Sequence, residues 1–302
     1  MIVNRDAVKL VFINLKTTFQ NALTASPGQY GEIAMTVPST TKTEDYGWLG
    51  DVPGMREWVG DKDVKSLSAY NYTITNKSYE ATIAVLRDDL EDDITGKYVQ
   101  SATNFGSAAA AWPDKLVFAL VNEGFSTKCY DGQYFFDADH LVCGQSVSNV
   151  STAPLSVATQ AAALAGYGAA RTAMMSITNE EGDPLDISPN VLLVHPALQD
   201  VANTLMTTDR LEDGKPNLYK GTAKVVVSAR IKNPKSWFLL DTTKSVKPFI
   251  FQQRKAPVFV SQTDLDSEDV FMRAEFKFGI ESRGNAGFAF WQLAFASTGE
   301  GN

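Results

Sequence analysis

The spacing of apolar residues predicts two helices in the first part of the chain. Over residues 8–23 they recur every three or four positions, at Val8, Phe12, Leu15, Phe19 and Leu23, which places them on one helix face. The same period extends over residues 95–122 and predicts a helix on the order of 40 Å long, at about 1.5 Å per residue. We expect Pro113 to kink or divide this helix, because proline removes one backbone hydrogen bond and clashes with the preceding turn.

The later helices and strands follow one another without a regular alternation. Helical spacing continues over residues 157–178 and, after Pro196, over residues 197–206, whereas residues 125–152 show no clear period and are expected to be irregular. Segments typical of strands are residues 70–75, 79–85, 191–194, 224–228, 236–240, 246–252, 257–261, 270–279 and 287–296. This mixture predicts an α+β fold rather than a doubly wound sheet.

Residues 39–63 form a polar segment that nevertheless carries several large apolar side chains. Trp48, Met55 and Trp58 lie among Thr, Gly, Asp and Glu residues, on either side of a Pro53-Gly54 turn signal. A segment this polar cannot close a core of its own, so we interpret it as a projecting hairpin covered by another molecule. Aromatic side chains anchor such interfaces because they bury a large area in a desolvated pocket. The alternative is that both tryptophans fold back into the core.

Length and composition indicate a soluble protein of about two domains. The chain has 302 residues, of which 44% are hydrophobic and 21% charged, so it can build a sizeable core. Its net charge of -8 disfavours a duplex DNA binder, since non-specific DNA affinity comes from basic groups on phosphates. The longest nearly apolar stretch, residues 287–296, is about half of the ~20 residues that span a bilayer. No secretory signal is apparent, so we expect a cytoplasmic-type protein with no membrane partner.

One cluster of residue types that bind metals lies within residues 129–143. It comprises Cys129, Asp137, Asp139, His140 and Cys143. Structural zinc sites use about four ligands and usually pair cysteines at C-x₂₋₄-C spacing, whereas these two cysteines are fourteen positions apart. We therefore interpret the segment as a structural loop and predict no stoichiometric metal, with a zinc site as the alternative.

The other candidates for chemistry also favour structural roles. His195 follows a predicted buried strand with no Ser or Cys nucleophile motif beside it, so we expect a core or turn histidine. Gly166-Tyr167-Gly168 lies inside a predicted helix, where close packing of small residues is a better interpretation than a phosphate loop. The chain has no G-x-S-x-G, Walker or H-E-x-x-H motif. We predict no catalytic residue and no cofactor.

Residues 87–93 form a strongly acidic run. Its carboxylates belong to Asp88, Asp89, Glu91, Asp92 and Asp93, without the central Gly and terminal Glu of a calcium loop. The simplest explanation is a helix start, because acidic residues there offset the positive N-terminal end of the helix. The alternative is an ion-pair surface between subunits, in which part of this run meets Arg56, Lys62 and Lys65 of the projecting hairpin. A body with a projecting arm and no active site suits an assembly subunit more than an enzyme.

Several stretches together resemble the major head subunit family of Mu-like phages. They are Thr43-Glu44, Gly47-Trp48-Leu49-Gly50, residues 53–60, 79–83 and 87–93, and Cys129-Tyr130-Asp131-Gly132 with Phe135-Phe136 and Asp139-His140. The likeness extends over most of the chain and is most specific over residues 43–140, whereas the last third matches only as a strand pattern. It implies the Hong Kong 97-type capsid fold, which is α+β with an extended β-hairpin loop and a long spine helix.

The resemblance also implies a domain layout and an interface between subunits. The expected parts are an N-terminal arm (1–30), an extended loop (31–75), a peripheral domain with the spine helix (76–152 and 246–302) and an axial domain (153–245). The residues expected at subunit contacts are Trp48, Met55, Arg56, Trp58, Lys62, Lys65, Asp88, Asp92 and Asp93.

A member of this family would be a major capsid protein and not an enzyme. It would form pentamers and hexamers that build an icosahedral shell around packaged double-stranded DNA, which it encloses without sequence-specific binding. The expected partners are further copies of itself, a scaffold and a head-maturation protease during assembly, and a portal at one vertex. Assembly would take place in the host bacterial cytoplasm. The alternatives are a zinc-dependent or other soluble hydrolase, and another virion protein such as a tail tube or portal.

Overall fold

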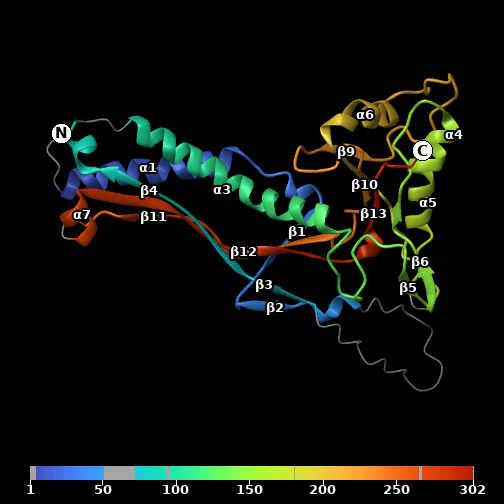
Figure 1. Cartoon of the computed structure of the whole chain (residues 1–302), viewed down its shortest axis with the longest axis horizontal. Helices are drawn as coiled ribbons and strands as arrows, with labels where there is room; N and C mark the ends of the chain where they lie inside the picture. The colour runs from blue at the N-terminus through green and yellow to red at the C-terminus, as the bar shows by residue number, and fades with distance from the viewer. Residues whose placement is uncertain (1–4, 51–71, 93–95, 180, 265–266, 302) are drawn as a thin grey trace, which may run out of the picture.

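A long four-stranded sheet with two helices forms one end of the molecule, and a five-stranded sheet with shorter helices forms the other (Figure 1). This computed structural model describes residues 5–50, 72–92, 96–179, 181–264 and 267–301. The projecting segment predicted around Met55 and Trp58 therefore lies outside the described residues. Among the described residues, no helix is both long and apolar enough to cross a membrane.

The four-stranded sheet has the order β1-β11-β12-β4. Its strands are β1 (Ala34–Pro38), β11 (Phe249–Gln262), β12 (Glu275–Phe288) and β4 (Lys77–Leu86). β1 runs parallel to β11, and the other neighbours are antiparallel. The helices α1 (Arg5–Ala25) and α3 (Gly96–Glu123) pack against each other and against this sheet. A Cβ atom on Gly106 of α3 would lie 2.5 Å from the carbonyl oxygen of Phe19, so glycine permits this close approach of the two helices.

The second sheet has the order β7-β13-β10-β8-β9. Its strands are β7 (Val150–Ser151), β13 (Ala294–Ser297), β10 (Trp237–Leu240), β8 (Val191–Val194) and β9 (Lys224–Val227). All residues of β8, β10 and β13 are buried, as expected for central strands covered on both faces. The helical segments beside this sheet are α4 (Gln160–Ala163), η3 (Leu164–Gly168), α5 (Ala169–Met175), η4 (Pro196–Leu198) and α6 (Gln199–Thr207).

Short elements connect the two ends of the molecule and extend from them. They are η1 (Tyr30–Glu32), β2 (Thr43–Asp45), η2 (Gly47–Gly50), β3 (Thr73–Thr75), α2 (Arg87–Glu91), β5 (His140–Val142), β6 (Gln145–Val147), α7 (Glu268–Arg273) and η5 (Trp291–Leu293). β2 pairs with β3 and β5 pairs with β6, both antiparallel. The chain passes from β12 through η5 directly into β13, so its last segment joins the two sheets.

The α+β prediction is confirmed, and the helical periods identify α1, α3, α4–α5 and α6. Pro113 does not divide α3, which is one continuous helix with Pro113 inside it. Its neighbours explain this continuity, because Trp112, Pro113 and Asp114 are all buried and the Asp114 carboxylate accepts a hydrogen bond from the Tyr30 backbone N–H at 2.7 Å. Packing therefore holds the helix together across the proline.

Four predictions in the β-rich parts were wrong. Residues 287–296 do not form one strand, since η5 separates the end of β12 from β13. Residues 125–152 are not wholly irregular, since they contain the β5–β6 hairpin and β7. Residues 246–248 precede the strand, and residues 249–252 and 257–261 belong to one strand, β11, whose register shifts against β12 on both sides of Lys255 and thereby accommodates Pro257. Residues 270–273 are helical, and Ala274, with φ 51°, ends α7 in a left-handed conformation before β12 begins.

Candidate functional site

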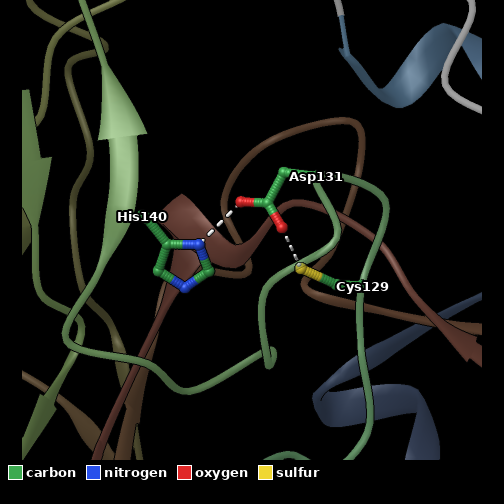
Figure 2. Close-up of side chains that lie close together, drawn as sticks. All are labelled: Cys129, Asp131 and His140. Atoms are coloured by element: carbon green, nitrogen blue, oxygen red, sulfur yellow. Dashed lines mark hydrogen bonds and ion pairs between the residues drawn. The ribbon is translucent and has the colours of Figure 1, made fainter. Parts of the chain in front are cut away.

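Two side chains of metal-binding types, Cys129 and His140, converge on the carboxylate of a third, Asp131 (Figure 2). The ring nitrogen Nδ1 of His140 lies 2.7 Å from Asp131 Oδ2, and the thiol of Cys129 donates to Asp131 Oδ1 at 3.0 Å. The Gln133 backbone N–H donates to the same Oδ1 at 3.0 Å. His140 is fully buried and stacks on the Trp291 ring of η5 at 3.9 Å between centroids. We call Cys129, Asp131 and His140 the Asp131 cluster.

Hydrogen bonding accounts for the geometry of the Asp131 cluster. Burial alone raises the pKa of the Asp131 carboxyl, but the hydrogen bonds from His140, Cys129 and the Gln133 backbone outweigh it and lower the pKa. Burial and the adjacent carboxylate raise the pKa of the Cys129 thiol, so the thiol is held in its protonated form. A carboxylate only accepts hydrogen bonds, so His140 Nδ1 carries the proton that it donates to Asp131.

The same geometry gives a poor fit to zinc. The ligand atoms of Cys129, Asp131 and His140 lie within 4.8 Å of one another, but no fourth His, Cys, Asp or Glu joins them among the described residues. A zinc ion also requires a thiolate, whereas the Cys129 thiol is a donor here. We interpret the cluster as a set of hydrogen bonds that fixes the loop before β5. The absence of a stoichiometric metal stays a prediction.

The sequence-predicted cluster differs from the one in the structure. Cys143 is exposed on the β5–β6 turn, with φ 51°, and its thiol donates to the Asn179 carbonyl. Asp137 and Asp139 accept bonds from nearby backbone and Ser146 groups instead of joining the cluster. Sequence reasoning missed Asp131, although it lies only two positions after Cys129 and directly before Gly132, which adopts φ 86°. In that turn the Gln133 backbone N–H holds Asp131 Oδ1, while Asp131 Oδ2 meets His140.

A second buried polar cluster lies where the segments before and after residues 51–71 meet β11. The Tyr46 hydroxyl donates to Gln252 Oε1 at 2.8 Å, and Gln252 Nε2 donates to Asn76 Oδ1 at 2.8 Å and to the Ile74 carbonyl at 3.1 Å. Asn76 Nδ2 in turn donates to Ser39 Oγ at 2.7 Å. We call these residues the loop-root network. It joins β11 to the segments on both sides of residues 51–71.

Glu44 extends the loop-root network at its exposed end. One carboxylate oxygen accepts hydrogen bonds from the backbone N–H groups of Thr40 and Thr41 and from the Ser39 hydroxyl, at 2.7 to 2.9 Å. The backbone bond from Thr41, followed by the Ser39 and Thr40 bonds, lowers the pKa of Glu44 to about 2. Glu44 therefore stays ionised and pins the Ser39–Thr41 turn against β2.

Some residues of the acidic run make contacts within the chain, and others are exposed. Asp89 accepts hydrogen bonds from Lys97 Nζ at 2.6 Å and from the Tyr98 hydroxyl, so it ties α2 to the start of α3. Asp88 and Asp92 are exposed, and the Asp92 backbone N–H bonds to the Asp88 carbonyl at 2.9 Å. Asp88 and Asp89 occupy the first turn of α2, which agrees with the helix-start interpretation.

Most of the residues predicted to contact neighbouring subunits lie outside the part of the chain that the structure describes. Asp93 and the residues Met55, Arg56, Trp58, Lys62 and Lys65 are outside the described residues, as is the side chain of Trp48. Their role between subunits therefore stays a prediction.

His195 is a turn histidine as expected, since its Nδ1 accepts a hydrogen bond from the Ala197 N–H at 3.0 Å at the start of η4. Gly166 and Gly168 lie in η3, where Cβ atoms would meet Pro154 and Tyr219, which confirms the packing interpretation.

Comparison with known proteins matches these features to phage head proteins. The family model described as "Mu-like prophage major head subunit gpT" matches residues 8–164, 155–231 and 228–302. The chain is 33% identical over 298 residues to the Mu-like prophage FluMu major head subunit of Haemophilus influenzae, covering 99% of this chain and 75% of that protein. It is 32% identical over 305 residues to the major capsid protein of Escherichia phage Mu, covering 99% of this chain and 76% of that protein.

Solved structures agree with the sequence relatives. A chain from the procapsid of bacteriophage JBD30 superposes with a TM-score of 0.61 at 34% identity, covering 99% of this chain and 77% of that chain. The α+β fold is thus the Hong Kong 97-type fold of phage capsid subunits, which are structural proteins. The chain belongs to the Mu-like prophage major head subunit family and is a major capsid protein.

Proposed function

We propose that the chain assembles as pentamers and hexamers into an icosahedral shell around packaged double-stranded DNA. The observation that carries this proposal is the similarity of nearly the whole chain to a chain of an assembled procapsid. The net charge of -8 is compatible with a shell that encloses the genome without gripping it. We propose no enzymatic activity, in keeping with the thiol and imidazole of the Asp131 cluster, both of which are buried and hydrogen-bonded to a carboxylate.

The same proposal extends to the partners and the layout of domains. A scaffold and a head-maturation protease act during assembly in the host bacterial cytoplasm, and a portal occupies one vertex. Residues 1–30 serve as the N-terminal arm, 31–75 as the extended loop, 76–152 with 246–302 as the peripheral domain, and 153–245 as the axial domain. The long sheet with α3 and the five-stranded sheet support two such domains, although the five-stranded sheet also includes β7 and β13, and the long sheet also includes β1.

The proposed subunit contacts combine the projecting segment with the acidic run. Trp48, Met55 and Trp58 would bury apolar area on a neighbouring copy, and Arg56, Lys62 and Lys65 would meet Asp88, Asp92 and Asp93. The exposure of Asp88 and Asp92 supports this arrangement. Any one exposed pair contributes only about 0 to 1 kcal/mol, but a shell repeats the contact at every subunit.

Electron microscopy and native mass of the purified chain test the proposed function. We expect closed shells or capsomer rings, whereas a particle of one to a few chains under all assembly conditions would contradict it. Trp58→Ala tests the interface, because removing a buried aromatic anchor costs about 2 kcal/mol or more. We expect this variant to stay folded by circular dichroism but not to assemble. Loss of secondary structure would instead place Trp58 in the core of its own subunit.

A further inference from the structure

Helix α1 carries apolar side chains on two opposite faces. Its inner face packs in a buried cluster with α3 and the long sheet (Figure 1). On the opposite face, Leu10 and Ile13 are 60% and 51% exposed. Residues three apart are neighbours on a helix surface, so these two side chains form one apolar patch. Apolar residues on both faces are typical of a helix that is covered on both sides, whereas the described residues cover only the inner face.

The apolar patch continues as a stripe with lysines along one flank. Thr17 follows Leu10 and Ile13 on the same face, and its hydroxyl already donates to the Ile13 carbonyl at 3.0 Å. Since a helix has 3.6 residues per turn, Lys9 and Lys16 lie one above the other beside this stripe. Both are exposed, and neither forms an ion pair among the described residues. We call these five residues the outer face of α1.

The charge of the outer face is opposite to that of the whole chain. Residues 7–31 contain no Asp or Glu, and their only charged side chains are Lys9 and Lys16, whereas the chain has a net charge of -8. The apolar stripe argues against a nucleic-acid backbone as the occupant, because phosphates offer no apolar surface to bury on it. The face instead complements a surface on which carboxylates stand beside apolar side chains.

The described helices of this chain do not supply that complement. Among the described residues, α3 and α6 are the other helices of eight or more residues, and they expose one carboxylate each, Glu123 and Asp200. α7 exposes Phe271 and Met272. It is only six residues long, however, and its last turn carries Arg273, which has the same charge as the lysines. The complement is therefore expected on a second protein.

We propose that the outer face of α1 binds an amphipathic helix of a different protein, with Asp or Glu along the flank that meets Lys9 and Lys16. Paired helices bury apolar residues spaced three and four apart, and the charges beside them decide which partner binds. The proposal rests on the proposed function for the presence of a protein partner during assembly. It adds the surface of this chain that the partner binds and the chemistry of the partner's segment.

Designed peptides measure this binding on the unassembled subunit. The probe is a helical peptide with the 21-residue length of α1, with leucine at the a and d positions of each heptad and glutamate on one flank. A second peptide carries glutamine in place of glutamate. We expect fluorescence anisotropy to show about tenfold tighter binding of the glutamate peptide, a difference of about 1.4 kcal/mol, and this preference should shrink at about 1 M salt. Equal binding of the two peptides, or no binding of either, would overturn the proposal.

Two substitutions locate the binding on α1. Ile13→Gln should weaken binding of the glutamate peptide about tenfold or more, and Lys16→Glu should remove the preference for glutamate. Leu164→Gln is the matched apolar control, because Leu164 is 55% exposed outside α1, and Lys115→Glu is the charge control on α3. Both controls should bind the peptide like the wild-type chain, and all four variants should keep its melting temperature. Equal binding by Ile13→Gln and Leu164→Gln would contradict the proposal.

Thiol labelling of Ile13→Cys distinguishes a second protein from a second copy. The glutamate peptide should slow modification at position 13 of the unassembled subunit, and mass spectrometry separates this label from any on the exposed Cys143. In shells assembled from the purified chain alone, a small reagent should label position 13 as fast as in the free subunit. Protection in those shells would mean that another copy covers the face, and the proposal would be wrong. Failure of the wild-type chain to form any shell would instead contradict the proposed function, while peptide binding still decides this proposal.

Discussion

Replacing Gln252 with leucine should destabilise the subunit strongly, although the two side chains have similar volumes. The Gln252 side chain is fully buried and makes three hydrogen bonds, to the Tyr46 hydroxyl, Asn76 Oδ1 and the Ile74 carbonyl. Leucine fills a similar volume but removes all three. The backbone pairing of β11 with β1 and β12 stays intact, since it does not involve this side chain.

The magnitude follows from the number of bonds and from the groups left behind. Each net hydrogen bond contributes about 0.5 to 1.5 kcal/mol, and a buried group left without a partner costs about 1 to 3 kcal/mol. Asn76, only 6% exposed, loses the donor to its Oδ1 atom. Apolar burial of the leucine offsets part of the loss, at about 25 cal/mol per Å². We expect a net decrease of about 2 to 4 kcal/mol in the free energy of unfolding.

Urea unfolding of the unassembled subunit measures this change. The midpoint should fall while the slope of free energy against denaturant stays constant, because the surface exposed on unfolding is unchanged. Gln262→Leu is the control, since Gln262 is exposed at the end of the same strand and should change stability by less than about 0.5 kcal/mol. If Gln252→Leu matches this control, the loop-root network does not contribute to stability and our reasoning fails.

Three further predictions concern charge, pH and metal. Lys62→Glu or Lys65→Glu should impair assembly at low salt, and adding Asp92→Lys or Asp93→Lys should restore part of it. Light scattering measures assembly of the single and the combined variants. If every charge reversal assembles normally, the acidic run has no role in the interface. The effect should weaken with salt, since the screening length falls from about 10 Å at 0.1 M to about 3 Å at 1 M. Glu44 has its pKa lowered from the usual 4.5 to about 2, so the stability that it contributes is complete above pH 4.5 and is lost as the pH falls towards 2. Glu44→Gln should flatten acid unfolding in that window, and an unchanged profile would refute the assignment. Elemental analysis should find no stoichiometric metal in the purified chain, and about one zinc per chain that is lost in Cys129→Ser would contradict the hydrogen-bonded interpretation of the Asp131 cluster.

Periodicity predicted the helices well because their apolar faces are continuous in the sequence. In α1, Val8, Phe12, Leu15 and Phe19 are all buried, and they pack in one cluster with Phe276 and Phe278 of β12. The bounds of β11 and β12 were less predictable. β11 passes from a buried end to a partly exposed end, and β12 is largely buried near both ends with an exposed Glu281 between them. Their hydrophobic pattern therefore changes along their length although the hydrogen-bonded pairing continues.

The Asp131 cluster shows why a side-chain site is harder to predict than a helix. Residue types identified the right loop, but they did not indicate that Asp131, beside the turn at Gly132, and not Asp137 or Asp139, meets His140. Asn149 was also missed. It is fully buried, its Nδ2 donates to the Phe135 carbonyl at 2.8 Å, and its Oδ1 accepts from the Asp137 N–H at 2.9 Å. Contacts of this kind depend on backbone direction, which no spacing of residue types specifies.

Buried polar bonds fix two parts of this subunit for the same physical reason, namely the segments on either side of residues 51–71 and the loop before β5. Burial of apolar surface stabilises a loop without fixing its direction, because the hydrophobic effect is non-directional. Hydrogen bonds to a carboxylate or amide weaken steeply when their angle changes. The loop-root network uses Gln252 and Asn76 beside the segments on the two sides of residues 51–71, and the Asp131 cluster uses His140 where the loop before β5 meets η5. A subunit that must present the same surface to every neighbour in a shell needs such directional contacts at the roots of its loops.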